Sequence, residues 1–336
     1  MSNFFLTIVG AGHATFLWMR QNILRTEAIL IGILFVAAAI QIAVRDTRTG
    51  DGRIIISGPD LNIDDLEDTF AGFGYTLDAV RSNDTTVPRL IISAVPGGLK
   101  DMRVIDRRKR LFFRSVLPLI LTVNEEISAD RSRLIELSDE VGTGEPAKAS
   151  LNKDHTAWLN DLSARYGIDL TDEDMTLREM IDVLLIRVAP IPTSLALAQA
   201  VEESAWGTSR FAREGNALFG QWVWNEEAGI VPEEQRPGQG YAVRAFETPI
   251  QSVRAYAKNL NTHWAYTDFR ERRAKMLEAS GELDGWALAE TLTRYSERGG
   301  AYVTSLHGIM RVNRLRALDK AELASPERMV QLAGAG

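Results

Sequence analysis

Two neighbouring carboxylates, Glu202 and Glu203, follow an apolar, small-residue segment from Ser194 to Val201. This segment predicts a helix, opened after Pro192 and closed at Gly207. Because it is apolar on nearly every side, we expect it to be buried, and burial raises the pKa of a carboxylic acid. An acid that stays protonated near neutral pH is what glycosidic bond cleavage requires. Spacing alone does not choose between the two glutamates, and a glutamate that simply reaches solvent at a helix end is the competing interpretation.

Composition narrows the chemistry further. The net charge of −7 over 336 residues argues against nucleic acid as the main partner. The chain has no cysteine, which excludes disulfides, thiolate catalysis and cysteine zinc sites. Its four histidines are scattered without metal-ligand spacing, and no phosphate loop or dinucleotide fingerprint is present. We therefore expect no metal and no cofactor, and a chemistry based on carboxylates, hydroxyls and amides.

The stretch from Ser194 to Gly220 carries the blocks Glu-Ser-Ala-Trp-Gly and Asn-Ala-Leu-Phe-Gly. With these blocks the chain resembles the glucosaminidase family of bacterial autolysins, and its Bax-like branch in particular. The resemblance covers about 84–318 and is strongest over 190–312. In that family the glutamate of the first block is the general acid, which here is Glu203 rather than Glu202. Two residues later, directly before Trp206, the family usually has a glycine where this chain has Ala205.

The resemblance also implies a set of groups around the acid. Tyr295 matches the active-site tyrosine of the family, and its phenol could donate a hydrogen bond to developing charge or to an acetamido group. Aromatic rings beside a cleft can stack on the apolar faces of sugars. We therefore expect catalytic roles for Glu203 and Tyr295, and substrate contacts from five further side chains: Asn216, Phe219, Trp222, Trp224 and Tyr302. Trp206 is expected to pack and fix the backbone of Glu203.

A second catalytic group stays open. Four glutamates follow Trp224 on a loop where one of them could face Glu203, and each could equally be a solvated loop residue: Glu226, Glu227, Glu233 and Glu234. The family varies at this position, and an acetamido-assisted route would use the substrate's own N-acetyl group. Retaining, inverting and substrate-assisted routes all remain compatible with the sequence.

The N-terminal region, residues 1–45, is hydrophobic, with a continuous apolar run at 28–44. As a helix this run would span about 26 Å, the short limit for a bilayer core of about 30 Å. It predicts a signal-anchor helix that attaches the chain to the membrane. A cleaved signal peptide and a buried globular helix are the alternatives.

The rest of the chain divides into four regions. These are a small α/β segment (46–100), a helical linker region (101–150), the catalytic domain (151–320) and a tail (321–336). In the α/β segment we expect strands near 53–57, 75–80 and 89–93 and a helix near 64–70. Capping boxes at Thr176 and Thr248 predict two helix starts, and further helices are expected near 267–280, 285–295 and 301–318. Alternating residues over 221–246 predict a β-hairpin.

Together these patterns predict a mostly helical α+β fold. We expect a lysozyme-like helical domain with a small β-hairpin lobe, preceded by the α/β segment and the membrane helix. The favoured function is an endo-β-N-acetylglucosaminidase that cleaves the glycan strands of peptidoglycan. Its expected location is the inner membrane, single-pass, with the catalytic domain facing the periplasm. The alternatives are a lytic transglycosylase or muramidase, and a non-catalytic envelope protein that binds glycan. The sequence identifies no protein partner.

Overall fold

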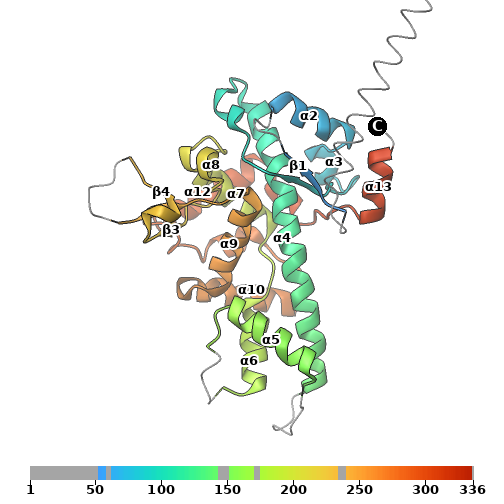
Figure 1. Cartoon of the computed structure of the whole chain (residues 1–336), viewed down its shortest axis with the longest axis vertical. Helices are drawn as coiled ribbons and strands as arrows, with labels where there is room; N and C mark the ends of the chain where they lie inside the picture. Colours follow the sequence, from blue (N-terminus) through green and yellow to red (C-terminus); the bar gives the residue numbers. More distant parts are fainter. Residues whose placement is uncertain (1–51, 58–61, 143–150, 170–174, 234–239, 335–336) are drawn as a thin grey trace, which may run out of the picture. The chain divides into compact units, whose positions relative to one another are not determined.

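The computed structural model describes residues 52–57, 62–142, 151–169, 175–233 and 240–334 (Figure 1). The predicted membrane helix at 28–44 lies outside these ranges. Among the residues inside them, no helix is both long and apolar enough to cross a bilayer. Contacts divide the chain into two units, Met1–Ile54 and Ile55–Gly336, and the site described below belongs entirely to the second.

The α/β segment contains two short strands and two short helices. Strands β1 (Ile54–Ile56) and β2 (Leu90–Ile92) occur where strands are predicted, and the structure pairs them with each other. Helix α2 (Ile63–Gly72) also matches its prediction. The third predicted strand, at 75–80, is wrong, because this stretch contains the helix α3 (Leu77–Arg81) instead. The Thr76 side chain accepts a hydrogen bond from the backbone of Ala79 and so caps that helix.

The predicted helical linker region is dominated by one 37-residue helix, α4 (Ile105–Val141). Its apolar side chains from Leu111 to Val123 are almost all buried. Figure 1 shows α4 running alongside the rest of the helical domain, and it contacts β2, α6 (Leu177–Arg187), α7 (Thr193–Ser204) and α9 (Pro249–Thr262). This helix therefore contributes to the core that surrounds α7.

The remaining described helices complete a mostly helical domain. Thr176 forms the predicted capping box with Glu179 at the start of α6, whereas Thr248 precedes α9 without a side-chain cap. The helix predicted at 285–295 stops early, because residues 290–299 form turns instead. The other helices are α5 (Lys153–Arg165), α8 (Arg210–Gly215), α10 (Thr267–Ser280), α11 (Gly285–Ala289), α12 (Gly300–Val312) and α13 (Pro326–Gly334). Single 3-10 turns occur at Gly97–Asp101, Glu226–Ala228, Trp264–Tyr266 and Leu315–Leu318.

The small lobe is an antiparallel sheet of three strands rather than the predicted two-stranded hairpin. Its strands are β3 (Trp222–Val223), β4 (Gly229–Ile230) and β5 (Ala242–Arg244), in the order β3-β5-β4. Gly229 pairs with Arg244, and a Cβ at Gly229 would lie 2.2 Å from the carbonyl oxygen of Val243. Only glycine allows the strands to approach this closely. The expected mostly helical α+β class is confirmed, with this sheet as its β part.

Helix α7 is the centre of the domain, and its N-terminus is held from a distant part of the chain. All its residues from Thr193 to Val201 are buried, as the sequence predicts. The carboxylate of Asp319 accepts hydrogen bonds from the Ser194 backbone N–H at 2.7 Å and the Ser194 hydroxyl at 2.8 Å. Burial outweighs these bonds and raises the pKa of Asp319 to about 6.

The loop that leads into α7 is fixed by Arg273, whose side chain is fully buried. Its guanidinium donates to Asn261 Oδ1 at 2.6 Å and to the Ala189 carbonyl at 2.9 Å. It also donates to the carbonyls of Ile186, Arg187 and Pro190, at 3.1–3.3 Å. Burial lowers the pKa of Arg273 to about 9, and the charges of Arg131 and Arg270 act in the same direction. Both the approach to α7 and its first turn are therefore held by hydrogen bonds from elsewhere in the fold.

Candidate active site

Helix α7 ends in three consecutive residues with positive φ: Ala205 (50°), Trp206 (62°) and Gly207 (72°). The backbone N–H of Gly207 donates to the Ser204 hydroxyl at 2.9 Å, which closes the turn. The Trp206 ring packs edge-on against Phe113, with ring centres 5.2 Å apart, and so anchors the turn to α4. This is the packing role expected of Trp206. The turn leaves Glu203 on the last turn of the helix.

The side chain of Glu203 is partly buried, and its two oxygens have different surroundings. Oε1 accepts a hydrogen bond from the Tyr302 hydroxyl at 2.9 Å. Oε2 lies beside Gly220, where a Cβ would be 3.3 Å away. Burial raises the pKa of Glu203, as does the charge of Glu202, whereas the Tyr302 hydrogen bond and the charge of Arg298 lower it. The net direction is upward, so the site favours the protonated acid relative to an exposed glutamate.

The neighbouring Glu202 is committed to an ion pair. Its Oε1 accepts from the Arg298 guanidinium and its Oε2 from the Ser305 hydroxyl at 2.7 Å. Both of its oxygens therefore have hydrogen-bond donors within the protein, one of them charged. The hydrogen-bond partners thus distinguish the two glutamates, which the sequence pattern alone could not do.

Behind Glu203 lies a line of buried polar side chains. The Tyr302 hydroxyl accepts from Gln199 Nε2 at 2.9 Å, and Gln199 Oε1 accepts from the Tyr256 hydroxyl at 2.7 Å. Tyr302 is 1% exposed. It was expected to contact substrate, but it lies behind the carboxyl, where burial and its contact with Glu203 keep the phenol neutral by raising its pKa.

Sequence reasoning did not identify Gln199 or Tyr256. Gln199 carried a usable signal, because it is the one polar side chain between Leu195 and Val201 in a helix predicted to be buried. A buried amide requires hydrogen-bond partners, so that position implied a polar network inside the core. Tyr256 carried no such signal, since a tyrosine on an amphipathic helix packs in a core without further explanation.

Tyr295 lies in the turns between α11 and α12, next to this line. Its ring stacks on Tyr302 with centres 5.5 Å apart and planes 8° apart, and Tyr266 lies 5.7 Å away on another side. Burial raises the pKa of Tyr295 well above its usual value, and the charge of Glu203 raises it further. Tyr295 is therefore a neutral phenol held against the ring that touches the candidate acid.

Two other residues that the sequence predicts to contact substrate, Asn216 and Phe219, instead hold parts of the fold together. The Asn216 amide bonds three backbone groups: it accepts from the Val95 N–H at 3.0 Å and donates to the carbonyls of Phe246 and Glu247. These bonds tie three segments together instead of orienting Glu203. Phe219 is 1% exposed and stacks on Tyr256 with ring centres 3.8 Å apart. Its ring therefore packs in the core rather than forming a surface for sugar.

Trp222 and Trp224, by contrast, are exposed on the β lobe. Their exposed fractions are 59% and 84%. Being two residues apart on an extended segment, they project from the same face, and both pack edge-on against Tyr241. The two exposed tryptophans and the half-buried Tyr241 form an aromatic patch of the kind that binds ligands in soluble proteins.

The candidate second carboxylates are all on the surface where the structure describes them. Glu226 and Glu227 are exposed on a 3-10 turn, and Glu233 pairs with Arg210 at 3.4 Å while remaining 83% exposed. Glu234 lies outside the described residues. Burial does not distinguish any of the three described glutamates as a catalytic group.

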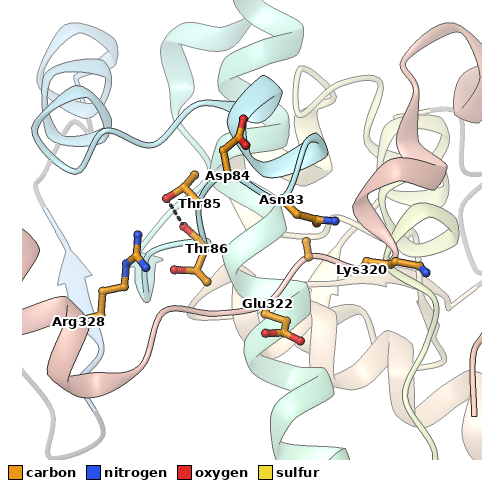
Figure 2. A pocket seen from close by; sticks show the side chains of 8 residues that line it. Asn83, Asp84, Thr85, Thr86, Lys320, Glu322 and Arg328 are labelled. Atoms are coloured by element: carbon orange, nitrogen blue, oxygen red, sulfur yellow. Dashed lines mark hydrogen bonds between the residues drawn. The ribbon is translucent and has the colours of Figure 1, made fainter.

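No cluster of three or more metal-ligating side chains occurs among the described residues. A polar cavity of about 380 Å³ lies elsewhere in the domain and shares no residue with the site around Glu203. Figure 2 shows its lining, which mixes both charges and includes Asp84, Lys320, Glu322 and Arg328, with Thr85 donating to the Thr86 carbonyl at 3.4 Å. This cavity is therefore separate from the candidate site at the end of α7.

Comparison with known proteins identifies the family of this chain. The family model for glucosaminidase, described as mannosyl-glycoprotein endo-beta-N-acetylglucosaminidase, matches residues 185–315, a range that includes Glu203 and Tyr295. Protein bax of Escherichia coli K12 is 34% identical over 224 residues, which cover 66% of this chain and 76% of that protein. The catalytic domain of the autolysin Auto from Listeria monocytogenes aligns at 17% identity and a TM-score of 0.28, covering 57% of this chain and 96% of that one. On the extent and identity of the match to protein bax, the chain belongs to the Bax-like branch of the glucosaminidase family.

Proposed function

We propose that this protein is a peptidoglycan hydrolase that cleaves the β-1,4 bond of glycan strands as an endo-β-N-acetylglucosaminidase, with Glu203 as the general acid. The observation that carries this proposal is the partly buried Glu203 carboxyl with its raised pKa, at the end of the central helix. Family membership supports a glycoside hydrolase independently of the geometry.

In the first step the Glu203 proton passes to the leaving glycosidic oxygen. The bond between the anomeric carbon and that oxygen breaks, its electron pair stays on the oxygen, and an oxocarbenium-like centre develops on the sugar. Glu203 becomes a carboxylate, which the Tyr302 hydroxyl at 2.9 Å and the positive charge of Arg298 stabilise. The environment thus favours the protonated acid before transfer and still supports the anion afterwards.

The oxocarbenium-like centre requires a second group. A substrate-assisted route, in which the acetamido oxygen attacks this centre, requires no protein carboxylate and so fits the exposed positions of Glu226, Glu227 and Glu233. The neutral Tyr295 phenol is suited to donate a hydrogen bond to the acetamido group or to a sugar hydroxyl. The Trp222 and Trp224 rings offer apolar faces for sugars of the strand.

Product analysis tests this function. Purified sacculi are digested with the protein and the soluble fragments are analysed by mass spectrometry. Fragments with N-acetylglucosamine at the reducing end are expected. N-acetylmuramic acid at the reducing end would identify a muramidase, and an anhydro end a lytic transglycosylase. Binding without any cleavage would identify a glycan-binding envelope protein. A parallel digest with Glu203→Gln excludes a contaminating hydrolase.

This substrate lies outside the cytoplasm, so the proposal includes export of the catalytic domain behind a signal anchor at 28–44. Protease added to spheroplasts should then degrade the domain while cytoplasmic marker proteins survive. A domain that resists protease until the membrane is disrupted would contradict the proposed topology and, with it, the substrate.

A further inference from the structure

The hydrogen bonds in the line of polar side chains behind Glu203 all run the same way, each donor pointing toward the carboxyl. This order determines which of the two Glu203 oxygens carries the proton. Tyr256 donates to Gln199 Oε1, Gln199 Nε2 donates to the Tyr302 hydroxyl, and Tyr302 donates to Glu203 Oε1. Gln199, Tyr256 and Tyr302 are each no more than 1% exposed. At such burial every donor and acceptor in the line has to be satisfied by a partner within the protein.

The far end of the line sets its direction. Within the part of the chain that the structure describes, the Tyr256 hydroxyl donates to Gln199 Oε1 and to no other acceptor. Reversing the Gln199 amide would turn its NH₂ group toward Tyr256 and leave the Tyr256 proton without an acceptor. A buried donor without a partner is strongly disfavoured. The nitrogen of Gln199 therefore faces Tyr302.

The consequence passes along the line to the carboxyl. Because the Tyr302 oxygen accepts from Gln199, its own hydrogen points to Glu203 Oε1, which is an acceptor in both protonation states of the acid. A proton on Oε1 would instead face the Tyr302 hydrogen. When Glu203 is protonated, its proton therefore belongs on Oε2, beside Gly220. Gly220 is itself partly exposed and has no side chain, so Oε2 is the oxygen with room for a substrate atom.

We propose that Tyr256, Gln199 and Tyr302 are positioning residues that place the transferable proton of Glu203 on Oε2, toward the substrate. The assignment of that proton to catalysis rests on the proposed function. The placement itself rests on the hydrogen bonds alone. Tyr256 and Gln199 act without contacting the substrate, and Tyr256 acts without contacting Glu203.

Tyr256→Phe is the sharpest test, because it removes one hydroxyl far from the carboxyl and keeps the ring that stacks on Phe219. The Gln199 amide is then free to reverse, and in that state Tyr302 no longer donates to Glu203. We expect kcat to fall about two- to tenfold, the effect of one ordinary hydrogen bond, with little change in KM. The pKa of Glu203 should rise, because its carboxylate loses a donor for part of the time.

The pKa is measured by carbon NMR on the full chain labelled at glutamate carboxyls, with the Glu203→Gln spectrum identifying the resonance. Tyr302→Phe, which removes the donor permanently, should raise the pKa more than Tyr256→Phe. Tyr75→Phe is the matched control: Tyr75 is 1% exposed, and its hydroxyl has no hydrogen-bond partner among the described residues. This control should keep the wild-type kcat and the wild-type Glu203 titration.

An unchanged or lowered Glu203 pKa in a folded Tyr256→Phe protein would overturn the proposal, and so would a kcat equal to that of the control. If Tyr256→Phe does not fold, Gln199→Met breaks the line at its middle with a side chain of similar volume, and the same pKa rise is expected. The NMR titration requires no substrate. A wild-type protein that cleaves no glycan would therefore refute the proposed function while leaving the placement of the proton open to measurement.

Discussion

Replacing each of the adjacent glutamates by glutamine is the most direct test of the acid assignment. In Glu203→Gln the side chain keeps its volume, and its carbonyl oxygen can still accept from Tyr302, which lies 2.9 Å from Oε1 in the wild type. The amide has no transferable proton. Turnover should therefore fall by about 10²–10⁴, the usual contribution of general acid catalysis. The fold should persist, because a neutral amide avoids the desolvation that a partly buried carboxylate suffers.

Glu202→Gln supplies the matched control on the preceding residue. It removes an ion pair in which the Arg298 side chain is 54% exposed and the Glu202 side chain 18% exposed, so the loss of stability should be about 1 kcal/mol. The Glu202 charge raises the pKa of Glu203, and its removal should lower that pKa. The alkaline limb of the pH–rate profile, where the acid loses its proton, should then move to lower pH. On the acidic side of that limb the activity should remain close to wild type.

Both variants are assayed by release of reducing ends from sacculi across pH, beside thermal melts that check folding. Retention of more than about a tenth of the wild-type rate in folded Glu203→Gln would refute its role as the acid. A larger loss of activity in Glu202→Gln than in Glu203→Gln would show that Glu202, and not Glu203, is the acid. An alkaline limb that moves upward in Glu202→Gln would contradict the electrostatic reasoning.

Three further predictions follow from the site and its support. Tyr295→Phe should lower kcat with little change in melting temperature, and a lower melting temperature with normal specific activity would instead indicate a packing role. Trp222→Ala and Trp224→Ala should weaken binding to sacculi in sedimentation assays by roughly 1–3 kcal/mol, and unchanged binding in both would place the glycan surface elsewhere. Asp319 has its pKa raised from 3.8 to about 6 in the folded protein, so its contribution to stability is greatest at low pH and declines by about 3 kcal/mol as pH rises from about 3 to 7. Asp319→Asn lacks this decline, so its melting temperature relative to that of the wild type should increase as pH rises. A melting-temperature difference that stays constant with pH would contradict the raised pKa of Asp319.

The features that the sequence predicted correctly are set by neighbouring residues. The burial of α7 follows from its uninterrupted small and apolar side chains, and the start of α6 follows from the capping box at Thr176. The incorrect strand at 75–80 arose from the same kind of local reasoning. There, the threonine cap at Thr76 outweighed the β-branched and aromatic residues beside it.

The arrangement around Glu203 depends on contacts that no local pattern encodes. Gln199 and Tyr256 are 57 positions apart in sequence, and Glu203 and Tyr302 are 99 apart. The position of Gln199 in an apolar helix indicates that its amide needs hydrogen-bond partners, but it does not indicate which hydroxyls provide them. Asn216 illustrates the converse, since a polar residue next to a motif resembles a ligand-binding group until its three backbone partners are known. The third strand of the small lobe likewise depends on the close approach at Gly229.

The long helix α4 also has a consequence for how this activity could be moved between proteins. The segment that identifies the family begins at residue 185, yet α4 ends at Val141 and contacts both α7 and α9. Leu117 and Leu119 are fully buried in the complete fold. A fusion or minimal fragment cut at the family boundary would strip this cover from the helix that bears Glu203 and expose its apolar surface to water. We therefore expect the smallest fragment that folds stably to include α4, and so to be longer than the segment that identifies the family.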